Sequence, residues 1–254
     1  VMHCGATPVM VDIDEKDFNI SVANIKKAIT SKTKAIIPVD ISGFPCDYEE
    51  INELVASKEI KSLFSPHSDE QATLGRILVM ADAAHSIGAS YQGKINGSVT
   101  DVAVFSFHAV KNLTTAEGGA VCLNLPERFD VDEVYRLLNV KSLHGQSKDA
   151  LAKAKADGNN WRYDVVEPGY KCNMMDIQAA IGLVELGRYE SNLNRRREIF
   201  AIYNQAFENE DLIIQPTFKS DKKESSYHLY MIRVKNATEA QRDEIINRIF
   251  EQQV

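Results

Sequence analysis

Strand-like apolar segments alternate with amphipathic helical segments in the first third of the chain, and this alternation constrains the fold more than any other feature. Residues 9–13 (VMVDI), 33–40 (TKAIIPVD) and 77–81 (ILVMA) have the length and composition of buried strands. Between them, Ser21 and an Asp47–Glu50 capping box carry the N-cap signals of two helices. The pattern predicts an α/β fold with a mostly parallel sheet flanked by helices, so ligands should bind at the carboxyl ends of the strands.

Two longer segments complete the expected secondary structure. Residues 57–76 are polar and rich in turn residues, which predicts a surface loop. From Met175 to about Asn209 the apolar spacing predicts one long helix or two in series. The buried positions expected in this segment are Ile177, Ile181, Val184 and Phe200.

A change of composition near Pro216 divides the chain. A charged connector, residues 218–226 (FKSDKKESS), follows it. Residues 227–234 (YHLYMIRV) then begin a second α+β unit. We therefore expect a large domain over residues 1–209 and the start of a smaller, incomplete C-terminal domain over residues 210–254. The chain opens in a sheet-like segment and closes within a helical pattern that starts at a Thr238–Gln241 capping box, so both ends of the natural protein are expected to lie outside this sequence.

The charge and cysteine content limit the possible partners. The formal net charge is −7 at pH 7, whereas nucleic acids and anionic membranes demand clustered Lys and Arg. No apolar segment is long enough to span a membrane and no signal peptide opens the sequence, so the cytoplasm is the expected location. The widely spaced cysteines predict reduced thiols and no metal site.

Residues 88–94 (GASYQGK) match the first part of the phosphate loop of nucleotide hydrolases. The next position is Ile95, so the hydroxyl that would hold Mg²⁺ is missing, and no long apolar helix follows. We interpret the match as coincidental.

The first candidate site residues follow the strand at residues 77–81. Asp82 stands at its carboxyl end, where a buried carboxylate is costly unless a cation or several donors meet it. Ala83 and Ala84 would let a flat ligand lie close to the backbone, and His85 comes next. A lone aspartate at a strand end more often caps a helix, so Asp82 by itself decides nothing.

A second strand end, at residues 102–107 (VAVFSF), is followed by His108 and Lys111. Desolvation beside a core strand favours the neutral amine of a lysine, as Schiff-base chemistry requires. Ser106 offers a hydroxyl for an anion, and a Gly-Gly pair before the next strand permits close backbone approach. Taken alone, Lys111 could equally be a surface lysine whose stem covers apolar neighbours.

The two strand ends together match the needs of pyridoxal 5'-phosphate. This cofactor requires a lysine for its aldehyde, a carboxylate that keeps its ring nitrogen protonated, and hydroxyls or amides for its phosphate. Asp82, Ser106 and Lys111 supply these groups in one short part of the chain.

Five segments resemble the DegT/DnrJ/EryC1/StrS nucleotide-sugar aminotransferases, which are fold type I pyridoxal-phosphate enzymes. In the order and spacing of that family, they are ADAAHSIGA, FSFHAVKNLTTAEGG, PGYKCNMMDIQAAIGLVEL, NRRREIFAIYNQAF and YHLYMIRV. Within the family, DAAH, SFHAVKN, EPGYK and NRRRE are most similar to the UDP-4-amino-4-deoxy-L-arabinose–oxoglutarate aminotransferase. The resemblance implies transamination of a nucleotide-linked 4-keto sugar, expected to carry UDP, with glutamate as amino donor. The expected product is an amino sugar for surface polysaccharide or lipopolysaccharide.

The resemblance also implies roles for the residues at the two strand ends. Lys111 matches the Schiff-base lysine, and Asp82 matches the partner of the ring nitrogen. His85 stands where the family has a residue near the phenolic oxygen of the ring, and Ser106 matches a phosphate-binding serine. We expect His108 to contact the substrate.

Two more distant residues are implied by the same resemblance. Asn173 matches an asparagine that reaches the cofactor phosphate of the neighbouring subunit, which implies a homodimer with shared active sites. His228 matches a histidine at the mouth of the substrate site. Asn173 could instead cap the following helix, and His228 could pack under the small domain.

Two other functions remain open at this point. Sugar 3-dehydratases of the same fold replace the Schiff-base lysine by histidine, which Lys111 disfavours although His108 lies close to it in the sequence. A non-catalytic regulatory or binding homologue is the other alternative.

Overall fold

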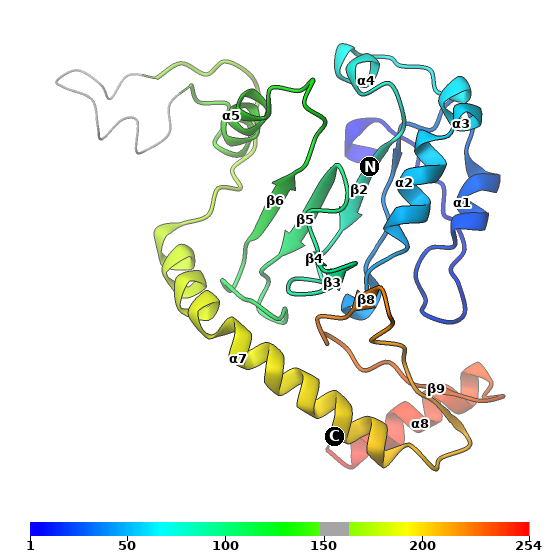
Figure 1. The fold of residues 1–254 in the computed structure, drawn as a ribbon. Coiled ribbons are helices and arrows are strands. Elements are labelled where there is room, and N and C mark those ends of the chain that lie inside the picture. Colours follow the sequence, from blue (N-terminus) through cyan, green and yellow to red (C-terminus); the bar gives the residue numbers. More distant parts are fainter. Residues whose placement is uncertain (148–162, 254) are drawn as a thin grey trace.

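A four-stranded sheet forms the centre of the computed structural model, which describes residues 1–147 and 163–253 (Figure 1). The strands are β1 (Ala35–Ile36), β2 (Leu78–Asp82), β5 (Val102–Ser106) and β6 (Gly119–Leu123), in the order β1-β2-β5-β6. β1, β2 and β5 run parallel, and β6 pairs antiparallel with β5. The expected α/β fold with a mostly parallel sheet is confirmed.

Helices cover one face of this sheet. They are α1 (Val22–Ala28), α2 (Tyr48–Ala56), α3 (Lys58–Leu63) and α4 (Asp69–Leu74), which Figure 1 shows together on one side. Ile25 of α1 and Ile51 of α2 join Val79 and Ala103 of the strands in one buried core. Because side chains alternate along a strand, Asp82 and Ser106 belong to the opposite face of β2 and β5.

The prediction of a surface loop over residues 57–76 is wrong, because α3 and α4 occupy most of it. Ser57 and Ser68 cap these helices by accepting from the backbone nitrogens of Ile60 and Gln71, each at 3.3 Å. Each helix has only six residues, so its apolar spacing is too brief to show against a polar background.

Two further details near the amino end differ from expectation. The strand expected at residues 9–13 forms only an isolated bridge between Ile13 and Ile20. Asp47 precedes α2 as expected, but its side chain makes no capping bond. The carboxylate lies instead 2.7 Å from Lys223 Nζ, since a buried cation attracts it more strongly than a backbone amide does.

One continuous helix, α7 (Asp176–Ala206), fulfils the prediction of a long helix. Of the buried positions expected in it, Phe200 is buried, whereas Ile177, Ile181 and Val184 are exposed. Their apolar side chains lie on a part of α7 that the described residues of this chain leave uncovered.

The remaining strands are short. A three-stranded antiparallel sheet, ordered β4-β3-β8, combines β3 (Ser90–Tyr91), β4 (Lys94–Ile95) and β8 (Lys223–Glu224). The GASYQGK segment therefore forms a hairpin and not a phosphate loop. β7 (Ile213–Ile214) pairs with β9 (Arg233–Val234), the only strand formed within residues 227–234.

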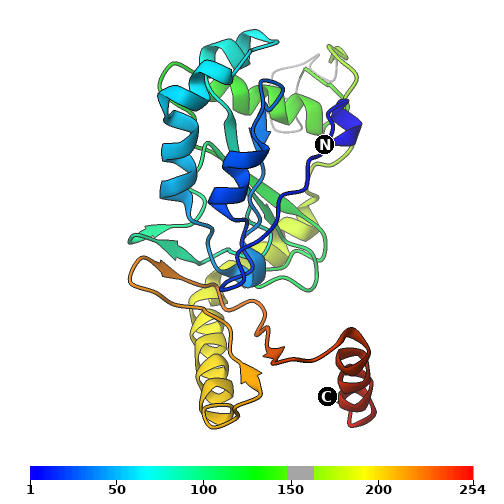
Figure 2. The same ribbon diagram turned by 90° about the vertical axis from the view of Figure 1, so that its right-hand side faces the viewer.

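Three further helical elements are η1 (Met2–Cys4), η2 (Ile41–Gly43) and α5 (Val131–Ser142). The last helix, α8 (Glu239–Glu251), begins at the expected Thr238–Gln241 capping box. Figure 2 shows α8 at the opposite end of the molecule from α3 and α4. Within the described ranges, none of the helices combines the length and the hydropathy needed to cross a membrane.

Candidate active site

Asp82 and Ser106 lie at the ends of neighbouring parallel strands. The register pairs Asp82 with Val104, so Ser106 lies two residues further along β5 at the same edge of the sheet. Asp82 N donates to Pro38 O at 2.8 Å, and its carboxylate Oδ1 accepts from Ala84 N at 3.1 Å. The aspartate thus caps the turn after β2.

Lys111 lies in the turn that follows β5. Its backbone nitrogen donates to His108 O at 2.9 Å, and Thr115 N donates to Phe107 O at 2.9 Å to close the turn. The lysine is half-buried. Its positive charge lowers the pKa of both His85 and His228, so its ammonium group lies within electrostatic range of both imidazoles.

His85 links the two strand ends. Burial lowers its pKa, the charge of Lys111 lowers it further, and the charge of Asp82 opposes the shift. The imidazole is therefore neutral near pH 7. Its Nδ1 is buried, and among the described residues it has no hydrogen-bond partner. A buried nitrogen without a hydrogen-bond partner is uncommon and marks a place where a partner is missing.

His228 stacks on His85, with ring centroids 4.4 Å apart and an interplanar angle of 36°. Its Nδ1 lies 2.8 Å from Asn112 Oδ1, while Asn112 Nδ2 donates to Ser226 O at 2.7 Å. The amide orientation makes Nδ1 the protonated nitrogen of His228. Burial lowers the pKa of His228 to about 4, assisted by the charges of His85, Lys111 and Arg196. His228 thus lies against His85 and Asn112, and its place at the mouth of a substrate site stays a prediction.

A fully buried aspartate, Asp40, supports this arrangement from behind. Its carboxylate accepts from Cys46 N, Tyr48 Oη, Ser86 Oγ and Asn96 Nδ2, at 2.9, 2.6, 2.7 and 2.6 Å. Burial raises the pKa of Asp40, and these donors oppose the rise. Through Ser86, Asp40 fixes the turn that carries His85.

Sequence reasoning missed Asp40 and Asn112. Asp40 ends the segment next to β2, where Val39 bridges to Asp82, so the strand-end argument that selected Asp82 could have found it. Asn112 directly follows Lys111, but its partners Ser226 and His228 are more than a hundred residues away and leave no local signal.

The side chains of three predicted site residues have other partners than the side chains of this cluster. Ser106 Oγ accepts from His108 N at 3.3 Å and so caps the turn. His108 Nε2 lies 3.5 Å from Glu117 Oε1, with both side chains exposed. Asn173 is exposed and accepts from Lys171 Nζ. Met175 is the N-cap of α7, so the alternative that Asn173 caps this helix is wrong.

The donor set fits pyridoxal phosphate. An amine (Lys111), a carboxylate (Asp82) and a neutral imidazole with an unpartnered buried nitrogen (His85) meet at one edge of the sheet. These are the groups that the aldehyde, ring nitrogen and ring oxygen of the cofactor require. Within the described part of the chain, no group of three or more His, Cys, Asp or Glu side chains is placed to hold a metal ion.

Known proteins share this sequence and this fold. The DegT/DnrJ/EryC1/StrS aminotransferase family matches residues 1–64 and 67–254. The spore coat polysaccharide biosynthesis protein SpsC of Bacillus subtilis is 38% identical over 234 residues, which cover 92% of this chain and 54% of SpsC.

Solved structures give the same result. Spr1654 of Streptococcus pneumoniae, described as a sugar aminotransferase, has a TM-score of 0.92 and 43% identity in its PMP form, covering 100% of this chain and 62% of that one. PseC of Helicobacter pylori, an aminotransferase involved in the biosynthesis of pseudoaminic acid, has a TM-score of 0.79 and 26% identity over 99% of this chain and 58% of its own. The chain thus spans between half and two thirds of these relatives. It belongs to the DegT/DnrJ/EryC1/StrS aminotransferase family, whose members depend on pyridoxal phosphate.

Proposed function

We propose that the protein transfers the amino group of glutamate to the keto group of a nucleotide-linked sugar, giving an amino sugar and 2-oxoglutarate. The observation that carries the proposal is the meeting of Lys111, His85 and Asp82 at the carboxyl edge of β2 and β5. The substrate favoured is a UDP-linked 4-keto sugar, for surface polysaccharide or lipopolysaccharide. The similarity to SpsC supports the polysaccharide assignment, and the nucleotide rests on the sequence resemblance alone.

Each residue of the cluster has a proposed role. Pyridoxal phosphate, when bound, supplies a ring that stabilises negative charge on the carbon next to the transferred nitrogen. Asp82 keeps the ring nitrogen protonated by placing a negative charge beside it, and His85 donates to or accepts from the ring oxygen. The amine of Lys111 would hold the cofactor through its aldehyde and, when free, would take up and return the proton at the substrate carbon.

Three polar side chains complete the proposed site. Ser106 contributes a hydroxyl to the phosphate, and its present bond to His108 N leaves that hydroxyl proton free to donate. His228 presents Nε2 at the substrate side, because Asn112 holds its Nδ1. His108 is proposed as a substrate contact from the outer side of the turn.

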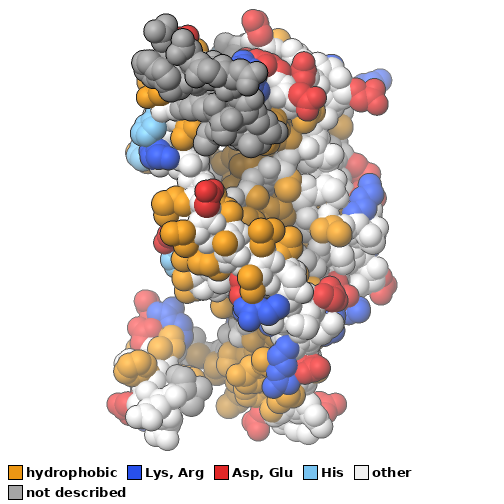
Figure 3. Space-filling model, turned by 90° about the vertical axis from the view of Figure 1, so that its left-hand side faces the viewer, with side chains coloured by type: hydrophobic (Ala, Val, Ile, Leu, Met, Phe, Trp, Pro, Cys, Tyr) orange, Lys and Arg blue, Asp and Glu red, His pale blue; other side chains and the backbone are white. Residues whose placement is uncertain are grey.

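A homodimer with shared sites is part of the proposal. A broad apolar surface is visible in Figure 3, and the exposed apolar side chains of the molecule include Val121, Ile177, Leu183 and Val184. Such a surface is typical of an interaction face. In a shared site, Asn173 would serve the partner's phosphate, in keeping with its exposure.

Mixing variants tests this dimer. Lys111→Ala and Asn173→Ala subunits are each expected to be inactive, yet after unfolding and refolding together, half of the dimers are mixed and carry one native site. The expected recovery is therefore about a quarter of the native activity. Zero recovery from a mixture shown by light scattering to be dimeric would contradict shared sites.

The reaction is tested with a panel of nucleotide-linked ketosugars, pyridoxal phosphate and ¹⁵N-glutamate, with products identified by mass spectrometry. A product carrying ¹⁵N supports the proposal. Loss of water without nitrogen uptake identifies a 3-dehydratase instead, and binding without turnover identifies a non-catalytic homologue. The proposed location is the cytoplasm, where glutamate and nucleotide sugars are available.

A further inference from the structure

The short segment from Ser225 to His228 forms one wall of the proposed site. Ser226 N donates to Gly43 O at 3.0 Å, Ser226 Oγ donates to His85 O, and His228 N donates to Ser42 O at 3.2 Å. Every one of these bonds joins the segment to a loop of the large sheet. The position of the His228 ring over His85 therefore depends on where this segment is held.

A buried lysine holds the segment immediately upstream. The side chain of Lys223 is only 9% exposed, with Nζ at 2.7 Å from Asp47 Oδ1 and 3.6 Å from Asp17 Oδ2. Nζ also donates to Pro45 O at 3.1 Å and lies 4.8 Å from the centroid of the Phe44 ring. A buried ammonium group is costly unless it is paired, so this constellation tolerates little displacement.

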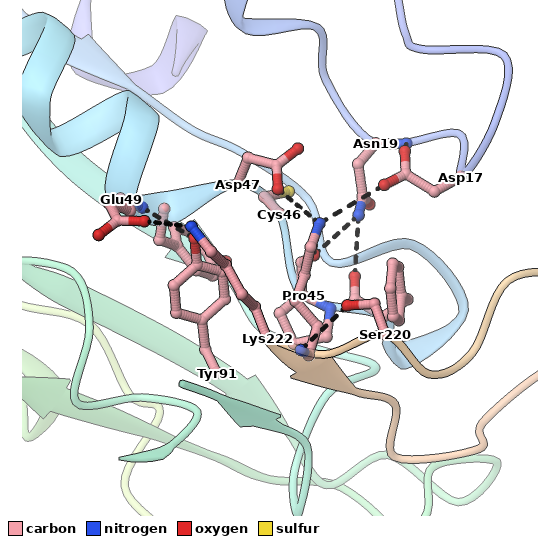
Figure 4. Close-up of polar contacts among 12 residues, drawn as sticks. Asp17, Asn19, Pro45, Cys46, Asp47, Glu49, Tyr91, Ser220 and Lys222 are labelled. Atoms are coloured by element: carbon pink, nitrogen blue, oxygen red, sulfur yellow. Dashed lines mark hydrogen bonds and ion pairs between the residues drawn. The ribbon is translucent and has the colours of Figure 1, made fainter. Parts of the chain in front are cut away.

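Figure 4 shows the surroundings of this lysine, with Asp17, Pro45 and Asp47 converging on one point. A second, exposed pair lies beside it, in which Lys222 Nζ is 2.7 Å from Glu49 Oε2. Gln92 N donates to Lys222 O at 2.6 Å and continues the pairing of β3 with β8. Lys222 and Lys223 thus fasten this stretch of chain to α2, to the loop before α2 and to the β3-β4 hairpin, just before the wall segment begins.

The loop that receives Lys223 also bounds the site. Phe44, Pro45 and Asp47 directly follow Ser42 and Gly43, whose carbonyl oxygens accept from the wall segment. Because Lys223 binds this loop, it holds the wall segment and the Ser42–Gly43 backbone, which are the two sides of one contact. The proposed reaction gives no role to the charge of Lys223, and none of the residues that contact its ammonium group belongs to the proposed catalytic cluster.

We infer that Lys223, held by Asp47 and Asp17, is a positioning residue that places His228 over His85 at the substrate side of the site. The inference deepens the proposed function, on which the meaning of His228 rests. Its geometry does not depend on any reaction, so it can be tested without substrate.

The test is the titration of His228 in the full chain, followed by NMR with ¹³C-labelled histidine and assigned through His228→Asn. His228 faces His85, Lys111 and Arg196, and with burial they hold its pKa at about 4. In Lys223→Met the ring is expected to leave this environment, so that its pKa rises toward 6.5. Lys223→Arg should retain the parent value.

A second variant and a control keep the test decisive. Asp47→Lys places a like charge next to Lys223 at a half-exposed position and should also raise the pKa of His228. Lys26→Met removes an exposed lysine paired with Glu59 at 2.9 Å, far from the connector in the sequence, and should change nothing. A His228 pKa that stays at about 4 in the folded form of either Lys223→Met or Asp47→Lys overturns the inference, even where thermal stability falls. Failure to find transamination leaves this titration unaffected and counts against the proposed function alone.

Discussion

Removal of the Asp40 carboxylate should be among the most damaging changes in this chain. In Asp40→Ala the donors on Cys46, Tyr48, Ser86 and Asn96 lose their acceptor inside a region without solvent exposure. An unsatisfied buried donor costs about 1–3 kcal/mol, so the expected loss is of the order of 4 kcal/mol or more. That loss is comparable to the whole stability of many domains, about 5–15 kcal/mol.

Asp40→Asn should be much milder, because the surrounding groups can rearrange. Asn96 Oδ1 is buried with no partner among the described residues, so a flip of the Asn96 amide can offer this oxygen to the introduced amide. The Ser86 hydroxyl can turn to Ala83 O, which already lies 3.3 Å away. The remaining cost is the loss of charge-assisted bonds and of a partner for Asn96 Nδ2, of the order of 2 kcal/mol.

Urea unfolding followed by far-ultraviolet circular dichroism measures both variants, with Asp211→Ala as an exposed control. The expected order of unfolding free energy is control, then Asp40→Asn, then Asp40→Ala, with the control unchanged. A loss below about 1 kcal/mol in Asp40→Ala would refute the view that four donors depend on this carboxylate. Equal losses in the two Asp40 variants would refute the proposed rearrangement.

Two further predictions concern the same wall of the site. Gly43 has φ +89°, and an added Cβ would overlap Ser226 Oγ and lie 2.8 Å from His85 O, so Gly43→Ala should lower stability by about 2–4 kcal/mol. Gly93→Ala, at φ +75° in open space, should cost only about 1 kcal/mol, and equal melting temperatures for the two would contradict the packing. The pKa of His228 lies below its unfolded value of 6.5, so the unfolded chain binds the extra proton and stability falls as pH drops from 6.5 to about 4. This loss of stability should be of the order of 2 kcal/mol after solvent screening, and His228→Asn should reduce it. A pH dependence of unfolding that is unchanged in His228→Asn would contradict the lowered pKa of His228.

The sequence predicted the parts of the site that local patterns encode. Asp82 and Lys111 each follow an apolar strand, and parallel pairing brings such strand ends to one edge, so local patterns are enough to select both as candidates. α7 and the cap at Thr238 were equally visible, because a long apolar period and a capping box are local signals.

The remainder depended on contacts that no local pattern records. From the sequence, Lys223 is one charged residue in a polar connector. It is nevertheless buried, because it forms ion pairs with Asp47 and Asp17, which are distant in the sequence. The apolar spacing predicts that Ile177 and Val184 are buried, but both are exposed. Periodicity identifies an apolar face of a helix and does not identify the surface that packs against it. The division into domains at residue 209 is a prediction that the single chain does not test.

The central claim is that the Lys111 amine holds the cofactor beside Asp82. The most direct measurement incubates the protein with pyridoxal phosphate, reduces it with borohydride and maps the modified lysine by peptide mass spectrometry. The account predicts a phosphopyridoxyl group on Lys111, absent from Lys111→Ala and retained in Asp82→Asn at lower cofactor affinity. Modification spread evenly over surface lysines, with Lys111 unlabelled, would contradict it.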